Sequence, residues 1–259
     1  MGDALFSHHE GCPTCSSRDN LARYDDGSAY CFGCGHHEKA GSDIGARVAT
    51  GRTRPKVALI RGEASNIPSR ALNKETCQKF RYLITPAGEQ AAGYTDEGGR
   101  VVAQKIRPKE KKGIRWVGDP SNAVRLFGWQ CWRAGGKRIV VTEGELDALS
   151  MSQAMNNRWP VVSVAHGAQA AWKDLQNPFI YEYLESFSEI VLMFDMDEHG
   201  QEAAVKCAEL FTMGKAKIAE LPLKDASDML TADRAQELRD AAWSAREFRP
   251  DGVVEGEDL

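Results

Sequence analysis

The sequence predicts an α/β protein in two unequal parts, a small N-terminal β unit and a larger mixed α/β domain containing a parallel sheet. Two Cys-x2-Cys pairs stand within the first 34 residues, which is typical of a small metal-built module. The second half alternates apolar runs with helical patterns, which indicates parallel strands joined by helices. A length of 259 residues also favours two domains over one.

Composition limits the functional classes. Hydrophobic residues make up 42% and charged residues 27%, a balance that argues against a fibrous or disordered chain. We expect no membrane partner, because no run of 18 apolar residues exists, and no secretory signal, because no basic region precedes an apolar stretch. The net charge of -4 is only weak evidence against a nucleic-acid partner, because binding uses a patch and not the average.

The first four of the seven cysteines form two pairs separated by fifteen residues: Cys12, Cys15, Cys31 and Cys34. Each pair aims two thiolates from one tight turn, and two such turns complete the tetrahedron that structural zinc prefers. Without an export signal the thiols stay reduced, which disfavours disulfides. His36 and His37 leave a Cys3His site as an alternative, but we interpret them as solvated loop residues.

Residues 1–43 are therefore predicted to form a zinc ribbon. Asp26-Gly27 between two alternating segments predicts a hairpin turn. A segment of about 40 residues buries little core, so the metal is expected to hold the fold. The ribbon is either an interaction module or a purely structural unit. The basic, glycine-containing residues 44–55 predict a flexible linker.

A second basic cluster spans residues 104–116 and holds six positive side chains and one negative one. The preceding residues 101–106 predict a strand, which places the basic side chains at a strand end and in a loop. Trp116 and Trp129 stand nearby for stacking. Positive groups beside aromatic rings suit nucleic-acid strands or nucleotides. The alternative is a merely solvated charged face.

Buried strands are predicted at residues 137–142, 160–164, 189–194 and 215–219, with a helix at 146–155, a long helical region after Gly167 and a helix ending near Phe211. In a parallel sheet the functional groups gather at the carboxyl ends of the strands. Three acids stand at those ends: Glu143, Asp195 and Asp197.

Carboxylates held together repel one another, so a hard divalent cation such as Mg²⁺ is their natural partner. The alternative is that acids after strands cap the following helices. We prefer that alternative for Glu145 and leave both interpretations open for Asp225 and Asp228.

Two stretches carry a family resemblance. Val141–Glu145 and Phe194–Asp197 resemble the TOPRIM domain of primases, topoisomerases and related nucleases. With the four-cysteine ribbon in front, the chain resembles the primase part of the primase–helicases of short-tailed (podoviral) phages. The resemblance extends over nearly the whole chain in the family's order. The supporting stretches are residues 73–79, 104–107, 162–168, 192–197 and 250–254.

The resemblance implies a DNA-dependent RNA primase that makes short RNA primers on single-stranded DNA, at a short recognition sequence, by Mg²⁺- or Mn²⁺-dependent nucleotidyl transfer. It implies catalytic and metal-site roles for Glu143, Asp195 and Asp197, with Asp225 as a further metal-site acid. Whether Glu143 binds metal or transfers a proton stays open, as does the number of metals. The implied nucleotide or template contacts are Lys105, Arg107, Lys109, Lys111, Lys112, Arg115 and His166.

The resemblance also implies an organisation and a set of partners. Residues 56–128 would form a basic subdomain of the RNA polymerase domain, 129–245 the TOPRIM subdomain, and 246–259 a tail or the start of a linker to a helicase domain. The implied partners are single-stranded DNA, ribonucleoside triphosphates, the RNA primer, a replicative helicase domain and a DNA polymerase. The implied location is the cytoplasm of the infected bacterial host.

Two departures from the family pattern matter. Asp26 and Ser28 would read the template, but Ser28 stands where the best-known member has a histidine, so the recognition sequence is open. The chain also lacks a Gly-x4-Gly-Lys-Ser/Thr phosphate loop, so it is expected to be a truncated piece, a short gene product or a stand-alone primase.

Two rival classes share parts of the pattern. A RecR-type recombination mediator also joins a zinc module to a TOPRIM fold, but there the two are close, whereas more than a hundred residues separate Cys34 from Glu143 here. A TOPRIM nuclease or topoisomerase is the enzymatic rival. A topoisomerase needs a nucleophilic tyrosine, and no tyrosine is marked by its sequence context.

Overall fold

The computed structural model describes residues 5–15, 17–31, 36–38, 58–109 and 113–250. The chain divides into two compact units, Met1–Pro55 and Lys56–Leu259. The predicted linker at 44–55 and the residues after 250 lie outside the described ranges. Within those ranges no helix has the length and apolar character needed to cross a membrane.

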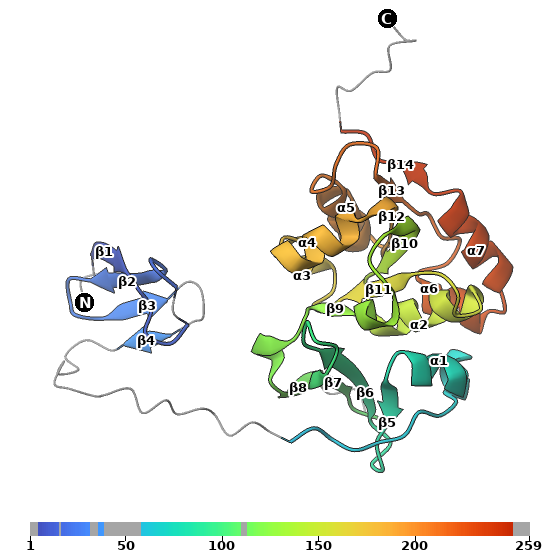
Figure 1. Ribbon diagram of the computed structural model, residues 1–259, viewed down its shortest axis with the longest axis horizontal. Helices are drawn as coiled ribbons and strands as arrows, with labels where there is room; N and C mark the ends of the chain where they lie inside the picture. Colours follow the sequence, from blue (N-terminus) through green and yellow to red (C-terminus); the bar gives the residue numbers. More distant parts are fainter. Residues whose placement is uncertain (1–4, 16, 32–35, 39–57, 110–112, 251–259) are drawn as a thin grey trace, which may run out of the picture. The chain divides into compact units, whose positions relative to one another are not determined.

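The first unit contains a four-stranded antiparallel sheet in chain order (Figure 1): β1 (Phe6–Glu10), β2 (Leu21–Tyr24), β3 (Ala29–Cys31) and β4 (His37–Glu38). The predicted turn at Asp26-Gly27 is confirmed. Gly27 has a φ of 81°, and Asp26 Oδ1 accepts a 2.8 Å hydrogen bond from the Ser28 amide. The buried apolar cluster of this unit is very small, so burial contributes little to its stability.

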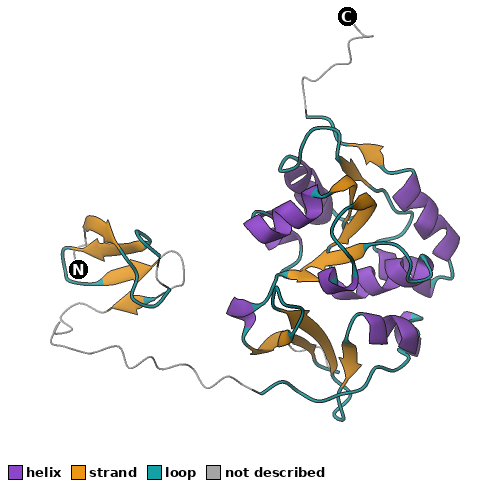
Figure 2. Ribbon diagram, viewed as in Figure 1, coloured by secondary structure: helices purple, strands orange, loops and turns teal. Residues whose placement is uncertain are grey.

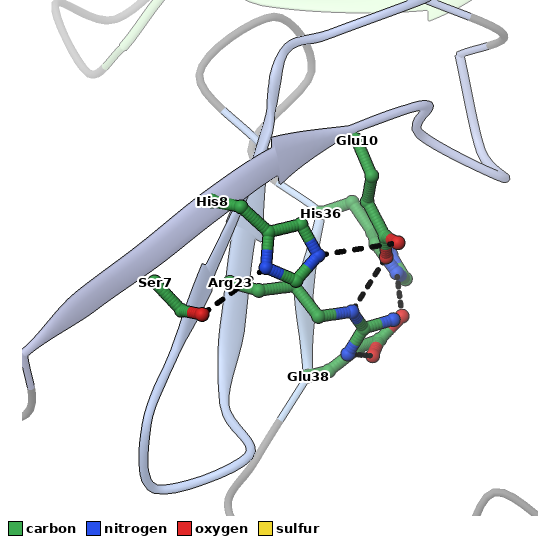
Figure 3. Close-up of polar contacts among 6 residues, drawn as sticks. All are labelled: Ser7, His8, Glu10, Arg23, His36 and Glu38. Carbon is green, nitrogen blue, oxygen red and sulfur yellow. Dashed lines mark hydrogen bonds and ion pairs between the residues drawn. The ribbon is translucent and has the colours of Figure 1, made fainter.

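An ionic bridge braces this sheet (Figure 3). Arg23 of β2 donates to Glu10 of β1 at 2.5 Å and to Glu38 of β4 at 2.9 Å, so it ties both edge strands to the middle of the sheet. His36 Nε2 lies 3.2 Å from Glu38 Oε1. The interpretation of His36 and His37 as solvated loop residues is only partly correct. His36 lies outside the strands but is half-buried beside Glu38, and His37 is exposed but belongs to β4.

The large sheet of the second unit has the order β14-β13-β12-β10-β11-β9. Four neighbouring strands are parallel, which confirms the predicted parallel sheet: β10 (Gly136–Thr142), β11 (Val161–Val164), β12 (Phe187–Met193) and β13 (Ala216–Ile218). Two antiparallel strands of two residues each close its edges: β9 (Leu126–Phe127) and β14 (Arg246–Glu247).

Helices cover both faces of this sheet (Figures 1 and 2). One face carries α2 (Glu145–Ala154), α6 (Ala226–Thr231) and α7 (Ala235–Trp243), and the other carries α3 (Ala168–Leu175), α4 (Pro178–Glu185) and α5 (Glu198–Ala208). Successive strand residues alternate between the two cores. Ile139 and Val141 pack with α3, α4 and α5, whereas Val140 packs with α2. This double burial explains why the strands appear as continuous apolar runs.

The single long helical region predicted after Gly167 is two helices. Asn177 and Pro178 interrupt it: the Asn177 side chain accepts hydrogen bonds from the first amides of α4, and proline occupies the first turn. Proline removes a backbone donor and is favoured at a helix start, so the chain ends α3 and begins α4 there.

A smaller antiparallel sheet precedes the large one in the chain. Its strands follow chain order: β5 (Tyr82–Ile84), β6 (Gln90–Thr95), β7 (Val101–Arg107) and β8 (Arg115–Gly118). Around it lie α1 (Lys74–Lys79) and three short 3-10 helices, η1 (Pro68–Arg70), η2 (Pro120–Asn122) and η3 (Trp129–Cys131). Arg115 belongs to β8, together with Trp116, which corrects the prediction that this basic side chain stands at the end of the preceding strand or in a loop.

Phe127 joins the two sheets. Its ring centroid lies 5.7 Å from that of Phe80 and 5.6 Å from that of Tyr94, and all three rings are fully buried. Because Phe127 belongs to β9 of the large sheet and Tyr94 to β6 of the small one, one apolar core runs through both. The relative position of β7 and the carboxyl edge of the large sheet is thereby fixed.

Candidate functional site

The first unit offers a thiol cluster. The sulfur atoms of Cys12, Cys15 and Cys31 all lie within 4.8 Å of one another, with Cys15 and Cys31 Sγ 3.7 Å apart. Such a set suits a thiophilic metal ion. Cys34, the fourth predicted ligand, lies outside the described residues.

The two predicted template-reading residues share one turn. Asp26 is exposed, and hydrogen bonds from the Ser28 side chain and amide hold the pKa of its carboxyl below the usual value. Ser28 is half-buried. The turn therefore presents an ionised carboxylate with a hydroxyl beside it.

A carboxylate cluster lies at the carboxyl edge of the large sheet. Glu143 follows β10 and Asp195 follows β12, as predicted. Burial and the charges of Glu143 and Asp225 raise the pKa of Asp195 to about 6. Burial together with Asp225 and Asp195 raises the pKa of Asp147 well above its usual value. These coupled shifts show that the four carboxylates act on one another electrostatically.

Asp147 was not predicted. It stands within α2, one turn beyond Glu143, and its Oδ1 accepts a 3.1 Å hydrogen bond from the Ser227 amide of α6. A Cβ on Gly144 would lie 2.7 Å from Asp147 Oδ2, so the glycine makes room for this carboxylate. The Glu143-x3-Asp147 spacing, which puts both acids near the start of one helix, was the available signal.

The loop before α6 completes the cluster. Met196 donates its amide to Lys224 O at 2.8 Å, which holds this loop beside the end of β12. Lys224 Nζ then lies 3.4 Å from Asp195 Oδ2. Asp225 caps α6 by accepting from the Asp228 amide at 2.7 Å, so the capping alternative is correct for it, yet its charge also reaches Asp147 and Asp195.

Asp197 is placed differently from the other predicted acids. It is exposed and caps α5 by accepting from the Gly200 amide at 2.9 Å. A Cβ on Gly200 would lie 2.2 Å from the Asp195 carbonyl oxygen, so only glycine lets α5 start this close to the strand end. Asp197 does not line the cleft described next. The charge of Asp195 is the main cause of the raised pKa of Lys224, and the charge of Asp197 adds to it.

A cleft of about 440 Å³ lies between the acids and β7. Its acidic wall includes Glu143, Asp147 and Asp195, and its basic and aromatic wall includes Lys105, Arg107, Trp116 and His166. The structure thus brings together side chains that are far apart in the sequence. Trp129, by contrast, packs against Phe179 at 5.1 Å and does not line the cleft.

Lys105 is held in a buried polar network. Its Nζ lies 2.7 Å from Glu145 Oε1 and donates to Ala165 O at 2.7 Å, and the Tyr94 hydroxyl donates to the same Glu145 oxygen at 2.7 Å. The interpretation of Glu145 as a helix cap is therefore wrong. Gly144 occupies the cap position, and the buried Glu145 carboxylate ties α2 to β6 and β7.

The other predicted basic residues do not all reach the cleft. Arg115 instead forms two hydrogen bonds with Glu89, at 2.7 and 2.9 Å. Lys109 is exposed and does not line the cleft. Lys111 and Lys112 lie outside the described residues.

The acidic wall fits a divalent cation. Among the described residues, Glu143 Oε2 is buried and has no hydrogen-bond partner. A buried carboxylate oxygen without a partner is costly, and the cost rises beside other carboxylates. Hard cations such as Mg²⁺ take carboxylate oxygens as ligands. The acids of this wall are ligands of that kind, and a bound cation would be the partner that Glu143 Oε2 lacks.

Comparisons with known proteins agree with this architecture. Residues 140–230 match a family model described as Toprim-like, and residues 62–115 match one described as the N-terminal a+b fold of the bacteriophage T7 DNA helicase/primase. The fold and the site therefore define a TOPRIM protein. A small β unit with a thiol cluster that suits a metal ion precedes the TOPRIM region in the sequence.

Individual relatives make the assignment narrower. The DNA helicase/primase of Enterobacteria phage T3 is 37% identical over 97% of this chain. The primase fragment of the bacteriophage T7 primase-helicase has a TM-score of 0.66 and 34% identity, over 92% of this chain and 100% of that one. The chain belongs to the DNA helicase/primase family of these phages, as the resemblance implied. It spans 46% of the length of the phage T3 protein.

A third structure shows a relative in an assembly. It contains the bacteriophage T7 lagging-strand DNA polymerase interacting with primase domains of two gp4 subunits, bound to an RNA/DNA hybrid and dTTP. The match has a TM-score of 0.66 and 40% identity, and covers 72% of this chain and 94% of that one.

The carboxylate cluster predicts a pH-dependent stability. The pKa of Asp195 is raised from 3.8 to about 6 in the folded state, so its protonated form favours folding. That contribution is complete below pH 3.8 and is lost as the pH rises through about 6. Asp195→Asn cannot ionise and should stabilise the metal-free protein at pH 8 by about 1–2 kcal/mol. Urea unfolding between pH 4 and 8 in EDTA measures this.

The matched control is Glu202→Gln, an exposed acid on α5. It should keep the pH dependence of the parent protein, and Mg²⁺ should stabilise both the parent and this control at pH 8. If Asp195→Asn shows the same pH slope as the parent, the proposed repulsion in the cluster is absent.

The Lys105–Glu145 contact predicts a large effect of removing one partner. Glu145→Ala leaves the Lys105 ammonium, whose side chain is 14% exposed, without its carboxylate. We expect a loss of about 3 kcal/mol in unfolding free energy. Glu89→Ala removes the partner of Arg115, whose side chain is 47% exposed, and should cost far less, because water screens an exposed ion pair. Urea unfolding measures both losses. If the two variants lost the same unfolding free energy, the assumed difference between a buried and an exposed ion pair would be wrong.

Proposed function

We propose that this chain is a DNA-dependent RNA primase that joins ribonucleotides on a single-stranded DNA template. One observation carries the proposal: three carboxylates face Lys105 and Arg107 across a single cleft. This pairing of an acidic and a basic wall suits phosphoryl transfer, where a metal and cationic groups share the charge of a triphosphate. Membership of the helicase/primase family supports the same reaction.

The acidic wall is the proposed metal centre. Glu143, Asp147 and Asp195 would hold Mg²⁺ or Mn²⁺, and the partnerless Oε2 of Glu143 favours a ligand role over proton transfer for that residue. Asp197 and Asp225 would support the centre through their charge. A bound divalent cation would neutralise the triphosphate and the charge that develops during transfer.

The opposite wall is the proposed nucleotide site. Lys105 and Arg107 would bind phosphates as charge-assisted donors, and His166 would add a ring nitrogen. Lys105 is prepositioned because Glu145 and Ala165 O already hold its ammonium. One ribonucleotide would supply its 3′-hydroxyl and the second its α-phosphate. Arg115 and Lys109 are less suited to the role, because they do not line the cleft.

The N-terminal unit is the proposed template reader. Zn²⁺ would be held by Cys12, Cys15 and Cys31 with Cys34 as the fourth ligand, which the tetrahedral preference of zinc favours. The turn that carries Asp26 and Ser28 would contact the template bases. The hydroxyl of Ser28 differs in reach and stacking from the histidine imidazole that the best-known family member has at this position. We therefore propose that this chain recognises a different template sequence from that member.

The remaining proposals concern organisation and partners. We propose the boundaries 1–43 for the ribbon and 44–55 for the linker. Because β9 and β14 pair within the large sheet, we propose 56–125 for the basic subdomain, 126–247 for the TOPRIM subdomain and 248–259 for the tail, in place of the predicted 56–128, 129–245 and 246–259. Single-stranded DNA, ribonucleoside triphosphates and the RNA primer would be substrates and product. A helicase domain and a DNA polymerase are the proposed protein partners, supported by the phage T7 assembly. The proposed location is the cytoplasm of the infected host.

A priming assay tests the function. Labelled ribonucleotides, single-stranded DNA of mixed sequence and Mg²⁺ should yield short RNA with the parent chain. Asp195→Ala and Asp147→Asn should each lower RNA synthesis by about 100-fold or more, because they remove ligands of the charge-neutralising centre. Thermal unfolding should show both variants folded, and Glu202→Gln should retain full synthesis.

Other outcomes of the same assay contradict the proposal. DNA cleavage or relaxation without RNA products would identify a TOPRIM nuclease or topoisomerase. DNA binding with neither reaction would favour a recombination mediator. Wild-type synthesis by Asp195→Ala would reject the metal centre.

Metal content tests the ribbon. Cys15→Ser should lose zinc and the order of residues 5–38, because a unit with so small a core depends on its metal. Template-directed priming should then fail. Zinc is measured by atomic emission and ribbon order by amide exchange. Cys131→Ser, a half-buried cysteine of the second unit, is the control and should keep its zinc. A Cys15→Ser protein with full zinc would reject the assigned site.

A further inference from the structure

A buried carboxylate stands behind His166. Asp174 of α3 has a side chain only 2% exposed, and its two oxygens lie 2.9 and 3.1 Å from His166 Nδ1. Arg125 approaches the same carboxylate from the surface, with Nη1 3.8 Å from Oδ1. A carboxylate this buried needs a donor close by, and the imidazole Nδ1–H is the nearest one that the contacts provide.

The contact fixes which edge of the imidazole faces the cleft. With Nδ1–H donated to Asp174, Nε2 is the ring nitrogen left for a ligand, and the half-exposed His166 side chain lines the cleft. The ring also packs against Trp116 in a tilted arrangement. Its centroid lies 5.9 Å from that of Trp116, which packs on Tyr94 at 4.7 Å. The imidazole is therefore restrained from two directions.

The neighbours of His166 identify the class of ligand. The carbonyl of Ala165, the residue before it, accepts from Lys105 Nζ, and Arg107 lines the same wall. On the other side, a Cβ on Gly167 would lie 3.4 Å from Glu143 Oε1, so the same loop also reaches the acidic wall. His166 thus stands between the proposed phosphate and metal groups, where a triphosphate would bridge them.

We propose that Asp174 is a positioning residue for nucleotide binding. It orients His166 and, by accepting from Nδ1–H, stabilises the imidazolium form, whose Nε2–H donates to a phosphate oxygen of the incoming nucleoside triphosphate. This inference rests on the proposed function. It goes beyond that function by assigning a role to a residue buried behind the cleft, which touches no substrate itself. The arrangement follows the general rule that an outer carboxylate orients a functional imidazole and stabilises its protonated form.

Kinetics of primer synthesis test the inference. Asp174→Ala should raise KM for ATP about tenfold with kcat nearly unchanged, because a charge-assisted contact to the nucleotide loses its alignment. Asp174→Asn retains an acceptor for Nδ1–H and should recover most of the affinity. His166→Ala should raise KM as much as Asp174→Ala, and the double variant should be no worse than His166→Ala alone, because the two act as one unit.

Arg125→Ala is the matched control, because Arg125 touches the same carboxylate but is exposed and does not line the cleft. Its KM should equal that of the parent. Equilibrium binding of labelled ATP with Mg²⁺ provides a readout independent of catalysis, and thermal unfolding shows whether each variant is folded.

The outcomes separate the two proposals. If the parent makes primers and folded Asp174→Ala has the parent KM, or loses only kcat or stability, the positioning role is rejected and the primase function stands. Additive effects in the double variant would also reject it. If the parent makes no RNA, the primase function fails, and a parental ATP affinity in Asp174→Ala would then reject the positioning role separately.

Discussion

The mutual repulsion of carboxylates at one edge of the large sheet is the constraint on which the rest of the second unit depends. Parallel strands deliver Glu143 and Asp195 to the same edge, and α2 adds Asp147. Ionising all of them in a half-buried place costs free energy, which appears as the raised pKa values of Asp147 and Asp195. Lys224 and the Ser227 amide offset part of this cost. A fold that tolerates the remainder without a cation is poised to bind one.

The smaller sheet places positively charged side chains opposite these carboxylates. Lys105 crosses from β7 to Glu145, a fifth carboxylate close to the cluster, and the Tyr94 hydroxyl completes that contact. The ion pair neutralises one acid, while Glu143, Asp147 and Asp195 still line the cleft. Because the rings of Phe80, Tyr94 and Phe127 form one core, this electrostatic match does not have to hold the sheets together by itself. The aromatic packing fixes the distance between the acidic and the basic wall of the cleft. The charges on the two walls determine which ligands the cleft suits.

The sequence predicted those site residues that directly follow a predicted strand. Glu143 and Asp195 could be predicted because apolar strands lead into them and parallel strands end at one edge. Asp147 was missed although its spacing from Glu143 was a signal, because an acid inside a helix resembles any solvated helix position. Glu145 was misinterpreted because an acid in a first turn also suits the helix dipole. The sequence also did not reveal that Arg115 contacts Glu89 or that His166 contacts Asp174. These are tertiary contacts, which the periodicity of the sequence does not encode.

The short edge strands of the large sheet have a consequence for association between copies of the chain. A parallel sheet with open edges offers unpaired amides and carbonyls to any neighbouring strand. Here β14 pairs over two residues, both exposed and oppositely charged, and β9 is buried beneath the smaller sheet. Neither edge gives a second sheet a long register to extend. Both edges of the large sheet are therefore poor templates for strand exchange between copies of this chain.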